Sequence, residues 1–403
     1  MTQHALALAV EVVTTAMAVA GMGYFLAAMV AARVFLAARR VLLPPFAPSV
    51  SILKSLKGVD TGMLDSFRSH CRQNYSGAYE LLFGVASLTD PAASAVQQLQ
   101  REFPDRIIRL IECPRSLGAN GKVSTLVQLV PHAQHEFLLV GDSDITVGPR
   151  YLERVMSAFS QPIKAGPRNS QPVGLVTALY RGHAHRTLAS RFEALGIATD
   201  FQPSVLLSRL IEGGMRYGLG STLAVRREAL DRIGGFAALV DILADDYELG
   251  ARVSQAGYTV TLSAEVVETS TPAYTWRAFA DHQLRWLRTV RDARPKGYAG
   301  LVFTHGLAWA LLNALASGFS PLSLWLLGLS FFLRLTLAMM VGAEVLGDHQ
   351  VLPNLWLLPL RDLTALGMWT AGFASNNIVW RGERFTVTNG KLQSVDQRHS
   401  SQS

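Results

Sequence analysis

The chain has 403 residues, of which 49% are hydrophobic and only 17% are charged, and 37 Lys and Arg against 30 Asp and Glu give a net charge of +7. A soluble domain typically carries about 25% charged residues, and the charges here are concentrated in the middle of the chain. No basic run with interleaved aromatic residues is present, which argues against a nucleic-acid partner. Anionic lipid headgroups or a nucleotide diphosphate fit the positive charge. Two lone cysteines, Cys71 and Cys113, favour a reducing compartment over a disulfide framework.

The first expected element is a membrane helix. Residues 12–32 include no charged residue, and about 20 apolar residues are enough to cross a bilayer as a helix. A cleaved signal peptide would need a positively charged start, and residues 1–9 contain no Lys or Arg. Arg33, Arg39 and Arg40 follow the apolar run. By the positive-inside rule this predicts an uncleaved anchor, with the N-terminus outside and the next domain in the cytoplasm.

The middle of the chain alternates between strand and helix patterns. After a proline-containing linker, strands are expected at residues 49–55, 79–86, 106–111 and 136–140, and helices at residues 63–73, 91–102 and 123–130. Such alternation predicts an α/β domain with a mostly parallel sheet covered by helices. Ligands of these sheets bind outside the carboxyl ends of the strands. Polar segments follow three of the expected strands, at residues 57–60, 87–90 and 141–144.

An Asp-Ser-Asp segment closes the fourth expected strand. Asp142 and Asp144 are two positions apart, and carboxylates so placed can hold a hard divalent cation together with phosphate oxygens. The cation would neutralise the charge on a departing nucleoside diphosphate. One Asp-x-Asp is expected by chance in a chain of this length, so the position after an apolar strand is what favours the metal site.

Two glycine-containing segments have both a plain and a functional interpretation. Residues 118–122 (GANGK) are similar to a phosphate loop, but Ser116 stands where a Walker A motif needs glycine. Lys122 is therefore either a nucleotide-binding lysine or a solvated loop lysine. The glycines in residues 217–222 (YGLGST) either allow close approach to a sugar or acceptor, or form a simple turn.

Paired acids open a helix expected at residues 247–255. Asp245 and Asp246 are either capping residues that complement the helix dipole, or they include a general base, in which case Asp246 takes the proton from an attacking hydroxyl. A basic amphipathic helix follows at residues 275–290 and contains the sequence HQLRW. It fits an interfacial helix with a tryptophan at the headgroup level, and equally an arginine that clamps a diphosphate.

The remaining apolar segments predict C-terminal membrane helices. Residues 297–333 contain no Asp, Glu, Lys or Arg, and a turn at residues 317–321 (SGFSP) divides them into helices at 301–317 and 322–342. Arg334 within the second helix is either functional or extends to an interface. A third apolar run at residues 363–379 either spans the membrane, re-enters it or lies at its surface. If it spans, the C-terminal tail lies outside, and the basic residues of that tail conflict with the positive-inside rule.

The order of these motifs resembles the inverting, family-2-like glycosyltransferases of the GT-A fold, whose pattern is an Asp, an Asp-x-Asp, a catalytic Asp and a (Gln/Arg)-x-x-Arg-Trp motif. More narrowly, the chain resembles the ceramide glucosyltransferase family (family 21) and its bacterial relatives, the hopanoid-biosynthesis-associated glycosyltransferases. The matching stretches are residues 51–60 (SILKSLKGVD), 88–91 (LTDP), 118–122, 142–145, 244–249 and 380–385 (WRGERF).

The resemblance implies a role for each matching residue. Asp246 would be the catalytic base, and Asp142 with Asp144 would hold Mg²⁺ or Mn²⁺. The donor-binding residues would be Lys57, Asp90, Lys122, Asp142, His282, Arg285 and Trp286. His282 stands where the family has Gln or Arg, which leaves its phosphate contact open. The implied reaction is a single in-line displacement, with inversion, from a UDP-sugar to a lipid hydroxyl.

The expected organisation is an N-terminal anchor and basic linker (1–44), a GT-A domain (45–274), an amphipathic interfacial helix (275–296), C-terminal transmembrane helices (297–380) and a polar tail (381–403). The expected product is N-acetylglucosamine on a hopanoid polyol or glucose on ceramide, made at the cytoplasmic face of a bacterial inner membrane. A processive polysaccharide synthase shares the motifs but threads its polymer through more helices than are expected here. A transporter or membrane scaffold is the third alternative, although transporters keep their polar sites within membrane helices.

Overall fold

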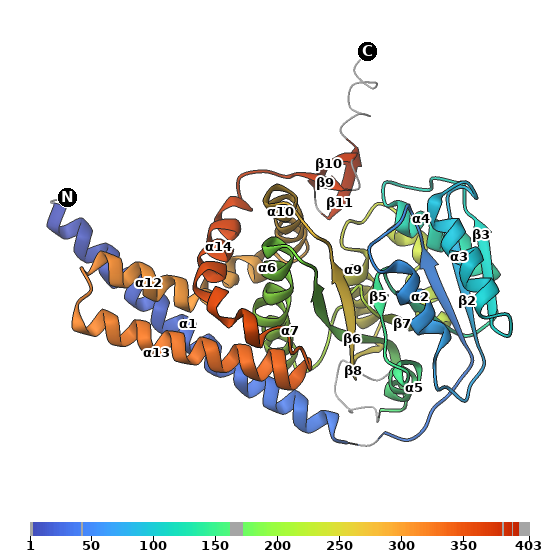
Figure 1. The fold of residues 1–403 in the computed structure, drawn as a ribbon, viewed down its shortest axis with the longest axis horizontal. Coiled ribbons are helices and arrows are strands. Elements are labelled where there is room, and N and C mark those ends of the chain that lie inside the picture. Colours follow the sequence, from blue (N-terminus) through green and yellow to red (C-terminus); the bar gives the residue numbers. More distant parts are fainter. Residues whose placement is uncertain (1–2, 42, 162–171, 381–382, 389, 395–403) are drawn as a thin grey trace, which may run out of the picture. The chain divides into compact units, whose positions relative to one another are not determined.

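The computed structural model describes residues 3–41, 43–161, 172–380, 383–388 and 390–394. The chain divides into two compact units. Unit 1 consists of Met1–Arg40, Arg181–Ile211 and Thr271–Glu383, and unit 2 of Val41–Tyr180, Glu212–Ser270 and Arg384–Ser403. Unit 2 contains most of a large sheet, and unit 1 contains the long apolar helices (Figure 1).

The large sheet has 8 strands in the order β3-β2-β1-β4-β7-β6-β8-β5. The strands are β1 (Val50–Ser55), β2 (Tyr79–Val85), β3 (Ile107–Glu112), β4 (Phe137–Val140), β5 (Ile145–Thr146), β6 (Val173–Ala184), β7 (Leu223–Arg226) and β8 (Thr259–Thr271). The pairs β1–β2, β1–β4 and β2–β3 are parallel, which confirms the four expected strands and their mostly parallel arrangement. The pairs β4–β7, β6–β7 and β5–β8 are antiparallel.

Every residue of β2 and β4 is buried, as is typical of parallel strands that are covered on both faces. The helices of unit 2 are α2 (Met63–Cys71), α3 (Pro91–Glu102), α4 (Gly121–Leu129), α5 (Tyr151–Ser157), α8 (Arg227–Arg232) and α9 (Asp245–Gln255), with short 3-10 turns η1 (Val130–His132), η2 (Ala158–Ser160) and η4 (Phe236–Leu239). Near the C-terminus, β10 (Glu383–Thr388) pairs antiparallel with β11 (Lys391–Ser394).

Two helices of unit 2 begin with a side-chain cap, and both caps lie next to candidate site residues. The carboxylate of Asp90 accepts a hydrogen bond from the backbone N–H of Ala92, with Pro91 in the first turn of α3. The side-chain oxygen of Asn120 accepts one from the N–H of Val123 at the start of α4. Such caps satisfy N–H groups that lack a partner within the helix, so the sequence itself fixes where these two helices start.

Unit 1 is almost entirely helical. Its helices are α1 (Gln3–Arg39), α6 (Leu188–Gly196), the π-helical η3 (Ile197–Phe201), α7 (Gln202–Ile211), α10 (Trp276–Ala293), α11 (Pro295–Gly300), η5 (Leu301–Thr304), α12 (Gly306–Ala316), α13 (Pro321–Ala338), the π-helical η6 (Met339–Val345), η7 (Leu352–Leu357) and α14 (Leu358–Ala371); a short strand, β9 (Asn377–Trp380), follows. A Cβ atom added to Gly21 would lie 2.2 Å from the Cα of Gly306. Glycine at this crossing therefore lets the backbones of α1 and α12 touch.

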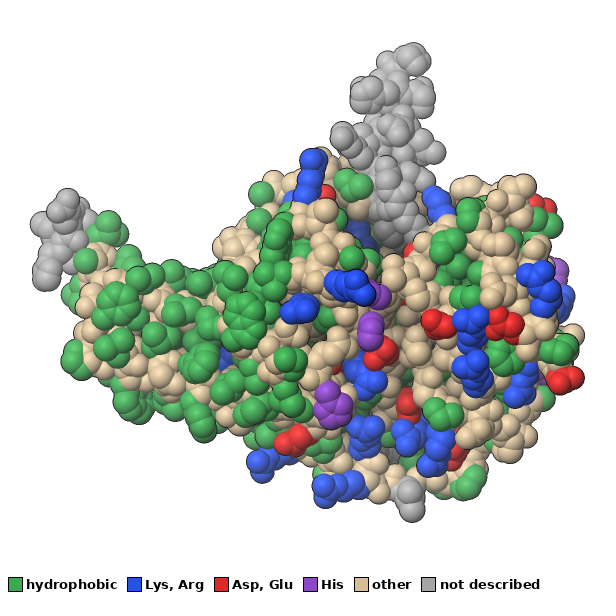
Figure 2. All heavy atoms as spheres, viewed as in Figure 1, with side chains coloured by type: hydrophobic (Ala, Val, Ile, Leu, Met, Phe, Trp, Pro, Cys, Tyr) green, Lys and Arg blue, Asp and Glu red, His purple; other side chains and the backbone are tan. Residues whose placement is uncertain are grey.

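Two helices of the described chain, Ala5–Arg39 and Pro321–Val345, are long and apolar enough to cross a membrane. A third span results if the segments Pro295–Thr304 and Gly306–Ala316, which are bent by 54° to one another, are counted together. The helix expected at residues 301–317 is thus interrupted at its fifth residue. Figure 2 shows hydrophobic side chains covering the end of unit 1 that α1, α12 and α13 form.

The third apolar run, expected at residues 363–379, is not one continuous helix. Helix α14 ends at Ala371, and the strand β9 occupies Asn377–Trp380. Within the residues that the structure describes, this run is not among the candidate spans. The sequence pattern detected its apolar composition correctly but not the change from helix to strand.

Candidate active site

The Asp-Ser-Asp segment after β4 is held by side chains from other parts of unit 2. The hydroxyl of Ser143 donates a hydrogen bond to the carboxylate of Asp60. The hydroxyl of Thr269 donates one to Oδ2 of Asp144, at 2.6 Å. Burial, and then the neighbouring charge of Asp142, raises the pKa of Asp144. Two carboxylates so close repel one another, and a bound cation would relieve that repulsion.

A buried lysine also contacts the Asp-Ser-Asp segment. Lys54 in β1 is almost fully buried, and its Nζ donates a 2.7 Å hydrogen bond to the main-chain oxygen of Asp142. Burial lowers the pKa of Lys54 to about 8, although the charges of Asp142 and Asp144 oppose the shift. Lys54 belongs to the first expected strand, and no sequence motif predicts a role for it. A lysine within a strand that the structure buries almost completely needs a specific partner.

Lys122 lies among carboxylates at the start of α4. Its Nζ is 2.8 Å from Oδ1 of Asp142 and 3.5 Å from Oδ2 of Asp245, and only 21% of its side chain is exposed. Burial alone would lower the pKa of Lys122, but the charges of Asp142, Asp245 and Asp246 raise it instead. The solvated-lysine interpretation is therefore wrong, because most of the side chain is covered and its ammonium group is paired with the carboxylates of Asp142 and Asp245.

Asp142 and Asp246 face one another across a glycine. A Cβ atom added to Gly220 would lie 2.9 Å from Oδ2 of Asp246 and 3.4 Å from Oδ2 of Asp142. The backbone of the YGLGST segment thus approaches these two carboxylates closely, which explains the glycine at this position. A larger residue would push at least one carboxylate away from the other.

The adjacent acids Asp245 and Asp246 have different surroundings. Asp245 contacts Lys122 and accepts a 3.3 Å hydrogen bond from the side chain of Asn120. Oδ1 of Asp246 accepts a 2.8 Å hydrogen bond from the N–H of Tyr247. Burial, followed by the charge of Asp245, raises the pKa of Asp246 to about 6, against the opposing effect of Lys122. Neither acid occupies the N-cap position of α9, since that residue is Ala244.

Asp90 joins two of the strand-end segments. Besides capping α3, its carboxylate accepts hydrogen bonds of 3.0 and 3.1 Å from the N–H of Gly58. Gly58 follows Lys57, which is exposed. Asp90 therefore fixes the turn that carries Lys57, and this turn continues to Asp60, the partner of the Asp-Ser-Asp segment.

The HQLRW residues lie on α10 in unit 1. Nδ1 of His282 is 2.8 Å from Oε1 of Glu193, a buried residue of α6. The imidazole ring also stacks on Tyr274, with centroids 5.6 Å apart. Glu193 could not be predicted as the partner of His282, because it is distant in the sequence and belongs to no motif.

Trp286 lies one helical turn after His282, and the two rings are 5.2 Å apart. The indole also packs against Phe201 at 6.0 Å, so it contributes to the packing of α10 on the α6–η3 segment. Arg285 lies between these residues on α10 and is half-buried. Unit 2 thus brings together Asp142, Asp144, Asp246 and Lys122, whereas His282, Arg285 and Trp286 lie in unit 1.

A model of glycosyl transferase family 21 matches residues 13–393. The chain belongs to this family. Two relatives from Caenorhabditis elegans are ceramide glucosyltransferase 3, 24% identical over 319 residues (70% of this chain and 67% of the relative), and ceramide glucosyltransferase 1, 21% identical over 361 residues (86% and 73%). The beta-monoglucosyldiacylglycerol synthase of Nostoc sp. is 26% identical over 207 residues (51% and 41%).

A mannosyltransferase from Pyrobaculum calidifontis, solved in complex with GDP-Man and Mn²⁺, is structurally similar, with a TM-score of 0.52 and 18% sequence identity; the match covers 91% of this chain and 97% of that one. The likeness confirms the expected GT-A fold. Membership of family 21, together with the glucosyltransferase relatives, makes the chain a hexosyltransferase. The transporter or scaffold alternative is therefore wrong.

The acidic residues of this family 21 enzyme suit a cation that is shared with a substrate. In the described part of the chain, no group of three or more His, Cys, Asp or Glu side chains could hold a metal ion by itself. Mg²⁺ is commonly bound by one or two carboxylates together with substrate phosphates and water. Asp142 and Asp144, with the raised pKa of Asp144, fit that kind of incomplete site.

Proposed function

We propose that this family 21 enzyme transfers a sugar from a UDP-sugar to a lipid hydroxyl with inversion, and that Asp246 is the general base. The observation that most supports this proposal is the arrangement at Gly220, where Oδ2 of Asp246 and Oδ2 of Asp142 approach the same small space. A base on one side, and on the other a carboxylate that would hold a cation at the diphosphate, are the two groups that such a one-step displacement needs.

The proposed proton transfer follows from the surroundings of Asp246. Because Oδ1 is occupied by the N–H of Tyr247, Oδ2 is the oxygen that accepts the proton of the acceptor hydroxyl. A pKa of about 6 leaves the carboxylate ionised at neutral pH but more basic than an ordinary aspartate, which favours general-base catalysis. As the acceptor oxygen bonds to the anomeric carbon, the bond to the diphosphate breaks and its electron pair leaves with UDP.

The proposed donor site neutralises the leaving group. Asp142 and Asp144 would hold Mg²⁺ or Mn²⁺, which supplies positive charge to the departing diphosphate. Lys122 adds a second positive charge, because its pKa is raised by the surrounding carboxylates. We further propose that Asp90 and Lys57 contact the nucleoside part of the donor. His282, Arg285 and Trp286 would contribute contacts to the diphosphate.

The proposed acceptor is a membrane lipid. The relatives named above include two ceramide glucosyltransferases and a beta-monoglucosyldiacylglycerol synthase, and two helices of the described chain could cross a membrane. We propose either N-acetylglucosamine transfer to a hopanoid polyol or glucose transfer to ceramide. Arg33, Arg39 and Arg40 after the first apolar run favour a cytoplasmic position for the catalytic residues. The candidate spans Ala5–Arg39 and Pro321–Val345 are the basis for proposing a multi-pass protein.

The test is transfer by the purified full-length chain in nanodiscs. UDP-glucose and UDP-N-acetylglucosamine are each supplied with ceramide, diacylglycerol or a hopanoid polyol, and products are identified by mass spectrometry and by the NMR coupling of the anomeric proton. One sugar per lipid, with inverted configuration and a rate from Asp246→Asn that is about 10²–10⁴-fold lower, is expected. A growing polymer would favour the polysaccharide synthase, and transfer only from a guanosine-diphosphate sugar would contradict the proposed donor.

A further inference from the structure

The segment formed by η7 and α14 has its charged residues inside and its apolar residues outside. Arg361 and Asp362 are the only charged residues between positions 352 and 374, and both are buried. Large apolar side chains occupy the opposite side, where Trp356 is 68% and Leu360 54% exposed. A helix on the surface of a water-soluble protein shows the reverse pattern, with its polar face outward.

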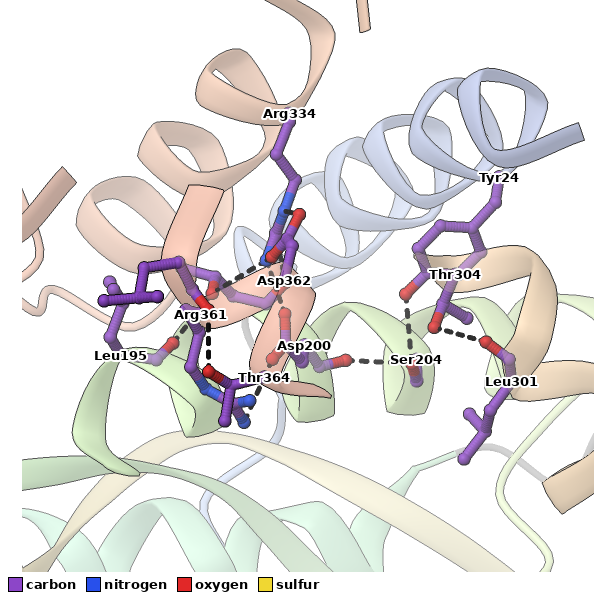
Figure 3. A network of polar contacts seen from close by, with 12 residues as sticks. Tyr24, Leu195, Asp200, Ser204, Leu301, Thr304, Arg334, Arg361, Asp362 and Thr364 are labelled. Carbon is purple, nitrogen blue, oxygen red and sulfur yellow. Dashed lines mark hydrogen bonds and ion pairs between the residues drawn. The ribbon is translucent and has the colours of Figure 1, made fainter. Parts of the chain in front are cut away.

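The buried charges of α14 are neutralised within unit 1. Arg334 of α13 binds Asp362 with two hydrogen bonds, Nε to Oδ2 at 2.8 Å and Nη2 to Oδ1 at 2.7 Å. Arg334 also donates to Asp200 of η3, and Nη2 of Arg361 lies 3.1 Å from Oδ2 of Asp200. Figure 3 shows these four side chains converging. Two positive and two negative groups leave this cluster formally neutral, as a water-poor environment requires.

Helix α14 is too short by itself for a complete span, and within the residues that the structure describes the run of η7 and α14 is not among the candidate spans. The 14 residues of α14 correspond to about 21 Å at a rise of 1.5 Å per residue, whereas the hydrocarbon core of a bilayer is about 30 Å thick. Arg334, the direct partner of α14, belongs to the candidate span Pro321–Val345. The ion pair therefore holds α14 against a helix that is itself long enough to cross the membrane.

We propose that the outer face of this segment is embedded among the acyl chains of one bilayer leaflet, and that α14 does not cross to the other side. The outer face consists of Leu352, Trp356, Leu360 and Leu363, all of them exposed, and the exposed Phe373 follows just after the end of α14. Acyl chains are the favoured occupant because the exposed positions from 352 to 374 include no charged residue, whereas a protein interface has a polar rim. This proposal is independent of the sugar and of the acceptor.

Spin labels on the full-length protein in nanodiscs test the proposal. In a background in which the buried Cys71 and Cys113 are replaced by alanine, labels are placed through Leu360→Cys or Leu363→Cys. The matched control is Ser94→Cys at an exposed position of α3 in unit 2. We expect power saturation to show labels at 360 and 363 that are accessible to oxygen but not to a water-soluble nickel chelate, and the opposite for the control.

Accessibility of both α14 labels to the nickel chelate would overturn the proposal. A second outcome would also overturn it: labels that neither reagent reaches, with spectra broadened by a nearby second label. If dilution with unlabelled protein removes that broadening, the face contacts another copy of the chain. A second measurement needs no cysteine replacement: lipids brominated on their acyl chains should quench wild-type fluorescence more than that of Trp356→Phe. Equal quenching of the two proteins would also contradict the proposal.

Discussion

The buried ammonium group of Lys54 donates a 2.7 Å hydrogen bond to the main-chain oxygen of Asp142. That oxygen belongs to the first residue of the Asp-Ser-Asp segment, so the bond helps to fix where both of its carboxylates lie. Lys54 makes this contact from β1, a neighbouring parallel strand that pairs with β4. Through its buried position, the lysine links the core of the sheet to the proposed metal site.

Replacement of Lys54 by methionine keeps the length of the side chain but removes the donor. An unsatisfied buried carbonyl costs about 1–3 kcal/mol, and the segment should shift. We expect at least about a tenfold rise in the Mn²⁺ concentration that gives half-maximal activity, which corresponds to roughly 1.4 kcal/mol. The measurement is a Mn²⁺ titration of sugar transfer beside a melting curve. A lower melting temperature with an unchanged Mn²⁺ requirement would mean that Lys54 serves stability alone.

The two carboxylates themselves give the second prediction. Asp142→Ala and Asp144→Ala should each abolish transfer, because the charge of the departing diphosphate is then no longer neutralised. A chelator should inhibit the wild type, and added Mn²⁺ or Mg²⁺ should restore it. Asp65→Asn is the matched control, since Asp65 is an exposed acid on α2 and should keep full activity. Persistent activity in excess chelator, with both aspartates replaceable, would remove the metal from the mechanism.

The pair formed by His282 and Glu193 gives a third prediction. If Glu193 positions the imidazole for the donor, Glu193→Gln should raise the KM for the UDP-sugar several-fold and leave the KM for the lipid unchanged. His282→Gln restores the residue type of the related family and should retain activity. In that background the second change, Glu193→Gln, should have little further effect, because the two residues act through one contact. Independent, additive losses in a double-mutant cycle would contradict a positioning role.

The local features of the fold could be predicted from the sequence. The four parallel strands have nearly their expected bounds, because hydrophobic patterning and flanking turns are local signals. An Asp followed by Pro at the start of an expected helix is a local signal of the same kind, and Asp90 is indeed the N-cap of α3. The antiparallel strands β6 and β8 were not assigned, since their pairing depends on residues far away in the chain.

The parts of the structure that the sequence does not predict depend on long-range contacts. Lys54 and Asp142 are 88 positions apart, and no periodic pattern relates them. Arg334 was open to two interpretations from sequence; the structure shows it buried and paired with Asp362, so it does not extend to an interface. A charged residue in an apolar helix signals that a partner exists, but which aspartate it binds is decided by packing.

The last prediction separates catalysis from a helix-end role at Asp245 and Asp246. The wild-type kcat/KM should rise with pH through about 6 and then level off, because the base must be deprotonated. Asp246→Asn cannot accept the proton and should be about 10²–10⁴-fold slower, with UDP affinity retained.

Since burial raises the pKa of Asp246 above its usual value, ionisation of its carboxyl group destabilises the folded protein. Asp246→Asn should therefore have a higher melting temperature than the wild type at pH 8, and this advantage should disappear as the pH falls below about 4.

Asp245→Asn should lose little activity. The acid limb of its kcat/KM profile should move to lower pH, because a charge that raises the pKa of Asp246 is gone. The measurements are pH profiles and melting temperatures of both variants in nanodiscs; equal, mild losses of activity in the two would show that Asp246 is not the base.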